Sequence, residues 1–314
     1  MPARWYVFYS VAYMKEINRV QLLHNPGAGS ESISREELSA IFKTTGWEFE
    51  YASTKDHWGI DPEADLVVVA GGDGTVKKIS VAAMEATINP LIGVLPMGTA
   101  NNLATSLGIP QDIKRIISSW KEGKAKAIAF DTGVINNPVI SDFFIEGVGF
   151  GIFPKMINDM KKKFPNGSSS PEDNLQNSLE AMYEATKDFV ASHCEINIDG
   201  RDYSGEMLLV EIMNIRCVGP NVFFAPHAHP GDGRFDIVLG GASDRSRLKK
   251  YFIRKINQDL DENPLPVIHG KNIKLTWNGP DFHLDDTIID ISAASEISIS
   301  INKHQLHFLV PEAF

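Results

Sequence analysis

Residues 70–75 read AGGDGT and lie between an apolar run, Leu66 to Val69, and a helix-like segment, Val76 to Ala86. The short run of β-branched residues predicts a strand that is buried on both faces. The glycines let the backbone turn sharply and approach a bulky group closely. We expect Thr75 to cap the following helix, so that free amide groups and the positive helix end converge on the turn. This arrangement predicts an anion site, most often one for phosphate, although an ordinary tight turn is the alternative.

Two further loops have the same small, polar character. Residues 25–30 read NPGAGS and residues 96–102 read PMGTANN, and each follows a predicted strand. Strands are predicted at 20–24, 47–52, 66–70 and 91–95, and helices at 34–44, 76–86, from 102 to Gly108, and at 112–120. This alternation predicts a parallel sheet with helices on both faces. Loops that leave the carboxyl ends of such strands share one edge of the sheet, so we expect a polyphosphate nucleotide to bind there.

The second half of the chain, after about Ala127, has a different pattern. Short, mostly alternating strands are predicted at 129–131, 142–146, 194–198, 207–213, 235–239, 273–277, 288–291 and 297–301. Their pattern predicts an antiparallel β-sandwich. A helical insertion is expected at 154–192, and a further helix from Arg245 to Ile256. The first 18 residues fit either an extra strand or a short helix.

Length and charge narrow the function classes. The 314 residues correspond to about two domains. Forty acidic and 30 basic residues give a net charge of −10, which argues against a general nucleic-acid binder. Cys194 and Cys217 have no metal-type or redox-type spacing, so a reduced, intracellular protein is the simplest account. Because no stretch approaches the roughly 18 apolar residues that span a bilayer, we expect a cytoplasmic protein, soluble or peripheral at the membrane.

The ordered set of motifs resembles a known family. Residues 24–30 (HNPGAGS), 71–75 (GGDGT) and 96–110 (PMGTANNLATSLGIP) are similar to the diacylglycerol kinase-like lipid kinases, which include bacterial lipid kinases and sphingosine kinases. NAD kinases share GGDGT, but NPGAGS and PMGTANN weigh against an NAD kinase. The resemblance continues at 143–151, 208–214, 225–236 and 308–311, and so covers nearly the whole chain from Val20.

The resemblance implies a fold and a reaction. It implies an α/β nucleotide-binding domain of the NAD kinase and diacylglycerol kinase type at 1–127 plus 308–314. A β-sandwich domain at 128–307, with the helical insertion at 154–192, would hold an apolar lipid slot. The reaction would transfer the γ-phosphoryl group of ATP, with Mg²⁺, to the hydroxyl of diacylglycerol, a sphingoid base or another lipid at a membrane surface. Sandwich edges could also pair between two chains as a homodimer.

The resemblance also implies a set of nucleotide-binding residues. They are Asn25, Thr54, Gly71, Gly72, Asp73, Gly74, Thr75, Gly98, Thr99 and Asn101. Backbone amides of Gly72, Gly74 and Thr75 would hold phosphates, because phosphoryl transfer depends mainly on positioning and charge neutralisation. Asp73 would orient Mg²⁺ or the acceptor hydroxyl. For Asn25 and Asn101, the alternative to nucleotide binding is a structural role in a turn or a helix cap.

The chain departs from the family at two acidic positions. Lys77 and Lys78 follow GGDGT where the family has asparagine and glutamate, and cations there oppose the helix end at a cost of roughly 0.3–1 kcal/mol. Bound phosphates would offset that cost. The family's Asp-Gly-Glu, which supplies the proposed base, is Asp285-Asp286-Thr287 here. The catalytic base is then Asp285, Asp286, Asp73 or none. A catalytically impaired homologue that senses nucleotide or lipid is therefore the alternative function.

Two further features remain open in the sequence. By resemblance, Asp232 with the carbonyls of His229 and Arg234 would hold a structural Mg²⁺, for which oxygen ligands are suited. His227 and His229 alternate like zinc ligands but lack a third partner, so turn residues are the better interpretation. Basic residues gather at 161–163 and along the helix at 245–256, where they form either a solvated face or a membrane-docking patch.

Overall fold

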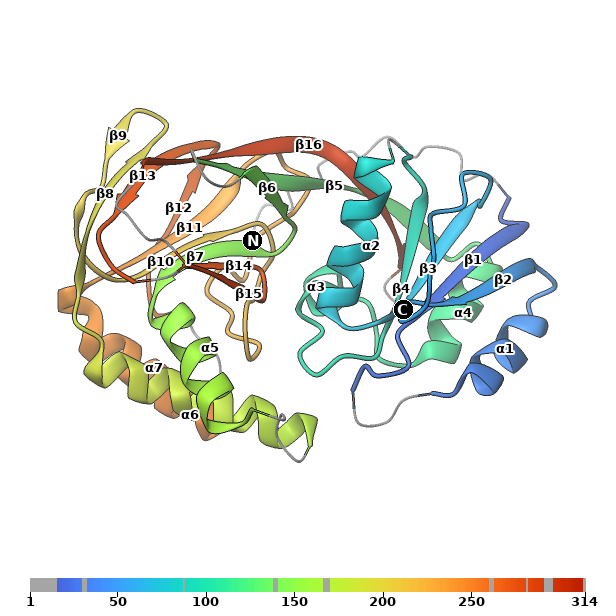
Figure 1. Ribbon diagram of the computed structural model, residues 1–314, viewed down its shortest axis with the longest axis horizontal. Coiled ribbons are helices and arrows are strands. Elements are labelled where there is room, and N and C mark those ends of the chain that lie inside the picture. The colour runs from blue at the N-terminus through green and yellow to red at the C-terminus, as the bar shows by residue number, and fades with distance from the viewer. Residues whose placement is uncertain are drawn as a thin grey trace, which may run out of the picture.

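The structure, a computed structural model, describes residues 16–29, 33–86, 88–137, 141–165, 170–259, 263–280, 282–290 and 296–312. The predicted element at the start of the chain, up to residue 15, and Ser30 of NPGAGS lie outside this range. Two domains stand side by side, and the second carries a layer of three helices on its lower face as drawn (Figure 1). The first domain runs from blue to cyan, and the second from green to red.

The first domain is the predicted parallel α/β layer. Its strands are β1 (Arg19–His24), β2 (Glu48–Ser53), β3 (Leu66–Gly71) and β4 (Leu91–Pro96), in the order β2-β1-β3-β4 and all parallel. Its helices are α1 (Arg35–Lys43), α2 (Asp73–Glu85), α3 (Asn102–Leu107) and α4 (Ile113–Lys121). Every residue of β3 is buried, as its apolar run predicts. Helix α2 stands on the side of the sheet that faces the second domain (Figure 1).

The second domain is built from antiparallel strand pairs. Its strands are β6 (Ser141–Phe144), β7 (Gly147–Gly151), β8 (Ser192–Ile198), β9 (Arg201–Asp202), β10 (Gly205–Met213), β11 (Phe235–Gly241), β12 (Val267–Gly270), β13 (Asn272–Trp277), β14 (Phe282–Leu284) and β15 (Thr287–Ile289). Strand β10 is central, because it pairs with β7, β8 and β11. Strands β7, β9, β12 and β14 were not predicted: β7 is rich in glycine, and the others have only two to four residues.

Three helices pack together along this domain. They are α5 (Ile152–Lys163), α6 (Pro171–Asp188) and α7 (Arg245–Ile256), with a short 3₁₀ turn, η1 (Ala242–Asp244), before α7. The bounds of α7 confirm the predicted helix. Arg245 donates to the carbonyls of Thr186, Lys187 and Phe189, so this basic residue satisfies the last carbonyls of α6. None of the described helices combines the length and the apolar character needed to cross a membrane.

Two long strands join the domains. Strands β5 (Ala125–Asn136) and β16 (Glu296–Pro311) pair antiparallel along nearly their whole length, with an irregularity between Asn302 and Leu306. The first part of β16 pairs with β13, and the last part pairs in parallel with β4. Figure 1 shows both strands crossing from one domain to the other. The predicted boundaries at 127 and 307 therefore fall inside continuous strands rather than in flexible linkers.

Asn214 ties this junction to the sandwich domain. It lies just after β10 and is buried, and its side-chain amide donates to the carbonyl of Asp131 at 2.9 Å and to that of Ile145 at 3.0 Å. Its backbone amide donates to the carbonyl of Glu146 at 2.8 Å. A single side chain thus fixes β5 against the turn that joins β6 to β7.

We predict that Asn214→Ala lowers the free energy of unfolding by about 2–4 kcal/mol, because it leaves two buried carbonyls without donors. Urea denaturation followed by circular dichroism measures the change. The matched control is Asn302→Ala in β16, because the side chain of Asn302 makes no hydrogen bond within the described residues. Equal effects of the two substitutions would contradict the assigned role of Asn214.

Candidate functional site

The three glycine-containing loops meet around one cavity. Its volume is about 560 Å³, and it lies at the carboxyl ends of the parallel strands. Its lining residues are Asn25, Ala28, Gly29, Thr54, Lys55, Gly72, Gly74, Thr75, Lys78, Gly98, Thr99 and Asp286. Seven of the ten predicted nucleotide-binding residues are among them: Asn25, Thr54, Gly72, Gly74, Thr75, Gly98 and Thr99. Loops that are far apart in sequence are thus brought together at the edge where the pattern placed them.

Glycine is required where two of the loops touch. A Cβ atom added at Gly98 would lie 2.5 Å from the Cα atom of Gly72, and one added at Gly72 would lie 2.9 Å from that of Gly98. Gly29 has a φ of +71°, and a Cβ there would lie 2.4 Å from the carbonyl oxygen of Met97. No other residue type allows these backbones to approach so closely, so the glycines set the shape of the cavity floor.

The amides at the start of α2 are available to a ligand. Within the described residues, the backbone amides of Gly72, Asp73 and Gly74 have no hydrogen-bond acceptor. The amide of Thr75 donates to the carbonyl of Gly72 at 2.9 Å, so it is not free in the way that the prediction of a phosphate contact assumes. The helix also begins earlier than expected, with Gly72 as its N-cap, and Thr75 does not cap it. Thr75 lies in the first turn of α2, and the free amides begin three residues before it, at Gly72.

Three predicted residues hold the loops in shape through contacts within the protein. Asn101 adopts a left-handed backbone with a φ of 52°, and its side chain accepts from the amide of Gly98 and donates to the carbonyl of Gly98, both at 2.8 Å. Asn25 donates to the Thr75 hydroxyl at 3.0 Å. Gly71 lies inside β3, where a Cβ would lie 2.7 Å from the Cβ of Thr75. A structural role in a turn, the alternative considered for the two asparagines, describes Asn101 well.

Two lysines give the cavity positive charge. The ammonium group of Lys78 donates to the Thr54 carbonyl at 3.4 Å and lies 5.1 Å from the centre of the Trp58 ring. Lys55 reaches over the first loop, with its amine 2.9 Å from the place where a Cβ on Gly27 would stand. Sequence reasoning missed Lys55, although its position one residue after Thr54 at the end of β2 was a signal. Both cations are placed to neutralise phosphate charge on a protein that is acidic overall.

Asp73 binds protein amides, and its carboxylate does not line the cavity. Its two oxygens accept from the amide of Asn102 at 2.9 Å and from that of Leu103 at 3.1 Å, at the start of α3. Burial raises the pKa of the Asp73 carboxyl, while these two hydrogen bonds partly oppose the rise. Asp73 therefore links the GGDGT loop to helix α3, where a negative charge is favourable.

Asp285 lies on the sandwich side of the boundary between the domains. Its carboxylate accepts from the amides of Ile145, Glu146 and Gly147, at 3.3, 2.8 and 3.1 Å. The Lys77 ammonium lies 3.2 Å from it and comes from α2, so this ion pair bridges the two domains. Four donors occupy the carboxylate, which leaves it little capacity to accept a further proton.

A buried pair, Glu211 and His283, packs against the turn that carries Asp285. His283 Nδ1 lies 2.8 Å from the Asp285 carbonyl, so it carries a proton, and His283 Nε2 lies 3.1 Å from both carboxylate oxygens of Glu211. Burial raises the pKa of Glu211. Burial alone lowers the pKa of His283, but the Glu211 carboxylate and Asp285 together outweigh it, so the net pKa is raised. The pair thus holds one shared proton between two buried side chains.

Glu146 is a buried carboxylate that sequence reasoning did not select. It is 7% exposed and lies in the turn between β6 and β7. Burial raises its pKa well above the ordinary value, and the charges of Asp73, Asp285 and Asp286 add to the rise while Lys77 opposes it. It lies within the resembling segment 143–151, but nothing in that pattern pointed to its carboxylate, because only its position between the domains distinguishes it from other glutamates.

The predicted structural metal loop is held together by protein contacts. Both carboxylate oxygens of Asp232 accept from Arg234, one from its backbone amide at 3.1 Å and one from its guanidinium at 2.8 Å. The His229 carbonyl accepts from the Asp232 amide at 3.2 Å. The part of the chain that the structure describes holds no cluster of three or more His, Cys, Asp or Glu suited to a metal ion. Mg²⁺ at this loop stays a prediction.

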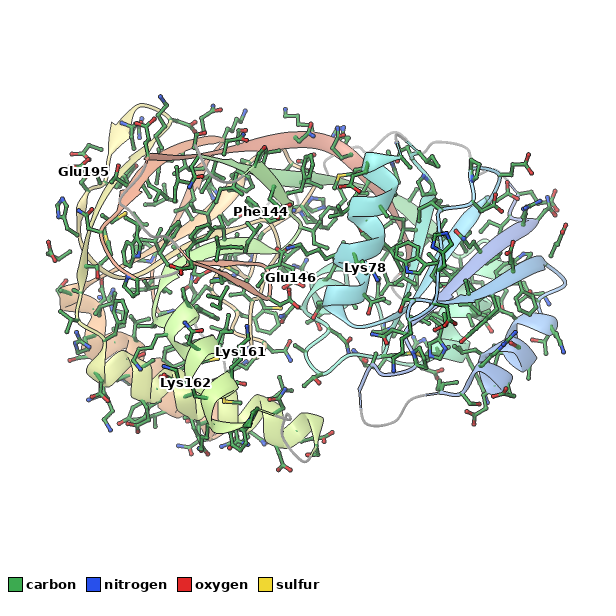
Figure 2. The ribbon with its side chains drawn as sticks, viewed as in Figure 1. Lys78, Phe144, Glu146, Lys161, Lys162 and Glu195 are labelled. Carbon is green, nitrogen blue, oxygen red and sulfur yellow. The ribbon has the colours of Figure 1, made fainter. Side chains whose placement is uncertain are left out.

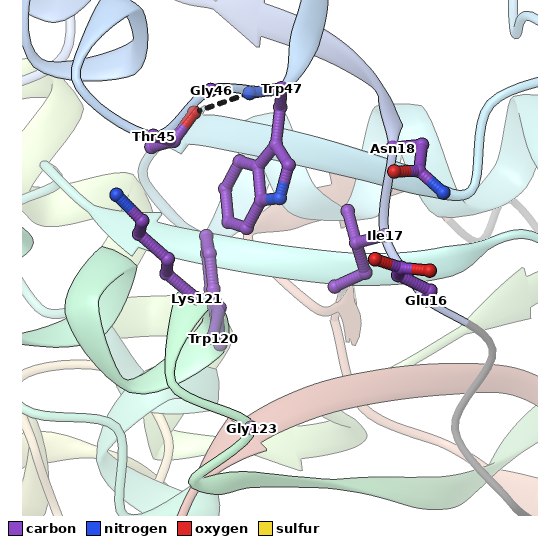
Figure 3. A pocket seen from close by; sticks show the side chains of 9 residues that line it. All are labelled: Glu16, Ile17, Asn18, Thr45, Gly46, Trp47, Trp120, Lys121 and Gly123. Atoms are coloured by element: carbon purple, nitrogen blue, oxygen red, sulfur yellow. Dashed lines mark hydrogen bonds between the residues drawn. The ribbon is translucent and has the colours of Figure 1, made fainter.

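Figure 3 shows a second cavity of about 420 Å³ at the opposite edge of the parallel sheet. Trp47, Trp120, Glu16 and Lys121 contribute to its walls, and the Trp47 amide donates to the Thr45 hydroxyl at 3.1 Å. It lies before the amino ends of β1 and β2, whereas ligands of such sheets bind at the carboxyl ends. We therefore place the functional site at the three loops.

The raised pKa of His283 predicts a pH-dependent contribution to stability. Its protonated form is favoured in the fold, so the contribution is complete below the ordinary value of 6.5 and is lost as pH rises through the folded value. The raised pKa of Glu211 likewise makes the stability fall as pH rises. We expect the stability advantage of the wild type over His283→Gln to shrink as pH rises above about 6.5. Urea denaturation at each pH measures it.

The control is His193→Gln, because His193 pairs with Glu206 on the surface and should contribute little to stability at any pH. An advantage of the wild type over His283→Gln that stays constant across this range would contradict the shared proton.

Comparison with known proteins places the chain in a family. The model of the diacylglycerol kinase catalytic domain matches residues 19–132, and that of the YegS C-terminal NAD kinase beta sandwich-like domain matches residues 160–289. A probable lipid kinase YegS-like from Enterobacter sp. strain 638 is 33% identical over 226 residues, which are 69% of this chain and 72% of that protein. A diacylglycerol kinase from Bacillus subtilis is 28% identical over 235 residues, 71% and 74% of the two chains.

The fold also has solved counterparts. A putative diacylglycerol kinase from Bacillus anthracis superposes with a TM-score of 0.73 at 20% identity, covering 94% of this chain and 98% of that one. This likeness confirms the predicted combination of a parallel α/β domain with a β-sandwich. Together with the matched sequence segments, it confirms the resemblance on which the site residues were chosen. The chain belongs to the diacylglycerol kinase-like lipid kinase family.

Proposed function

We propose that the protein transfers the γ-phosphoryl group of ATP to the hydroxyl group of a lipid. The observation that carries this proposal is the 560 Å³ cavity, where free amides of Gly72–Gly74 meet the cationic side chains of Lys55 and Lys78. Such a site suits a chain of phosphates, because helix-end amides and lysines both stabilise negative charge. The relatives named lipid kinase and diacylglycerol kinase support a lipid as acceptor.

The chemistry needs little from the protein beyond positioning. In-line attack by a hydroxyl on the γ-phosphorus is favoured when the phosphates are held rigidly and their charge is neutralised. Mg²⁺ accompanying ATP binds mainly through phosphate oxygens and water. This mode fits a site without a three-ligand protein cluster among the described residues. In our proposal the protein supplies the amide floor, and the two lysines supply charge.

The acceptor would come from a bilayer, so contact with a membrane surface is part of the proposal. Lys161, Lys162 and Lys163 are exposed at the end of α5. Figure 2 shows the first two in the last turn of α5, within the helical layer. Exposed lysines at a helix end suit the headgroups of anionic lipids.

The proposal is tested by incubating the protein with labelled ATP, Mg²⁺ and a panel of lipid alcohols in mixed micelles. We expect label to appear in at least one phospholipid product and none in NADP⁺ when NAD⁺ is the acceptor. Binding of ATP without transfer of label to any lipid would contradict the kinase proposal. That result would favour the nucleotide or lipid sensor that Lys78 and Thr287 suggest.

We predict that Lys78→Ala weakens ATP binding roughly 5–30-fold, which corresponds to the loss of about 1–2 kcal/mol from one charge-assisted contact. Titration calorimetry at low salt measures the dissociation constant. Lys271→Ala, at an exposed lysine just before β13, is the control and should leave the constant unchanged. If both variants bind ATP like the wild type, Lys78 does not contact the phosphates.

A further inference from the structure

The backbone of Glu146 is held rigidly where the two domains meet. Its amide donates to Asp285 at 2.8 Å, and its carbonyl accepts from the Asn214 amide at 2.8 Å. The amide of Gly147, the next residue, also donates to Asp285, at 3.1 Å. Figure 2 shows Glu146 on the side of the sandwich domain that is turned toward α2. A side chain anchored in this way has a defined position before any substrate arrives.

The carboxylate of Glu146 is buried but has no partner. Within the described residues no donor hydrogen-bonds to it, although the residue is only 7% exposed. The ionisable groups whose charges act on it come from every neighbouring element: Asp73 and Lys77 from α2, Asp285 and Asp286 from the turn after β14, and Cys217 after β10. A buried and unpaired carboxylate is costly, so its retention at this place calls for a role outside folding.

The other carboxylates whose charges act on Glu146 are occupied or exposed. Three amides and Lys77 surround Asp285, and two amides of α3 bind Asp73. Asp286 lines the cavity but is exposed, and it accepts from the Thr287 hydroxyl at 3.2 Å. Thr287, which stands where the family has its glutamate, carries no carboxylate. Glu146 is therefore the shielded carboxylate that can still accept a proton.

We propose that Glu146 is the general base of the phosphoryl transfer, taking over from the family glutamate that Thr287 replaces. This inference rests on the lipid kinase proposal above. The acceptor hydroxyl gives its proton to the Glu146 carboxylate, and its oxygen forms a bond to the γ-phosphorus. The bond between that phosphorus and the oxygen bridging to the β-phosphate breaks, and its electron pair leaves on ADP. The phosphorylated lipid, ADP and a protonated Glu146 are the products.

The test uses the full chain and the lipid that accepts phosphate in the transfer assay. We expect Glu146→Gln to slow single-turnover transfer by about 10²–10⁴-fold, the usual contribution of a general base. The dissociation constant for ATP and the thermal midpoint should not worsen, because the substitution removes a buried, unpaired charge. Glu146→Asp keeps a carboxylate and should retain more activity than Glu146→Gln. The control is Glu195→Gln, an exposed glutamate at the far end of the sandwich, which should match the wild type (Figure 2).

The pH dependence provides a second readout. The raised pKa of Glu146 means that the single-turnover rate of the wild type should climb with pH above the ordinary glutamate range, since only the ionised form accepts a proton. Glu146→Gln should lack this rise. Transfer by Glu146→Gln at the wild-type rate, with an unchanged pH profile, would overturn the assignment and leave the kinase proposal standing. ATP binding without lipid phosphorylation by the wild type would overturn both.

Discussion

The approach of Gly72 to Gly98 is the contact on which the functional site depends. It brings the loops after β3 and β4 together so closely that a single added methyl group on Gly98 would lie 2.5 Å from a backbone atom. Because the two loops touch, the amides at the start of α2 remain uncovered and face the cavity together with Lys55 and Lys78. A side chain at either glycine would separate the loops, and the free amides would no longer share one floor.

The carboxylates of Asp73 and Asp285 hold the other elements around the site in place. Asp73 fastens α2 to α3, and Asp285 fastens the β6–β7 turn while it pairs with Lys77 across the boundary between the domains. Helix α2 therefore contacts both domains through adjacent turns, at Asp73 and Lys77. Breaking the Lys77–Asp285 pair would leave an uncompensated buried charge, so this link favours one relative placement of the domains, whereas the Asp73 link acts within the first domain. Glu146 differs from these residues, because its backbone is held but its carboxylate is free.

Much of this architecture could be predicted from local sequence pattern. The apolar run of β3 and the glycine loops predicted the parallel sheet and its binding edge, and the basic segment from Arg245 to Ile256 predicted α7 within a residue. Roles that depend on distant partners could not be predicted. The sequence suggested Asp285 as a base, yet the amides that bind its carboxylate lie about 140 residues away. Glu146 lies in the resembling segment 143–151, but its carboxylate was not selected, since its importance comes from a domain boundary that forms only in three dimensions.

The most direct test of the central claim is a crystal structure with a non-hydrolysable ATP analogue and Mg²⁺. The account predicts that the phosphates lie on the amides of Gly72, Asp73 and Gly74, between the ammonium groups of Lys55 and Lys78. The terminal phosphate should face the sandwich domain. Phosphates bound elsewhere, or loop amides that remain in contact with solvent while the analogue is bound, would contradict it.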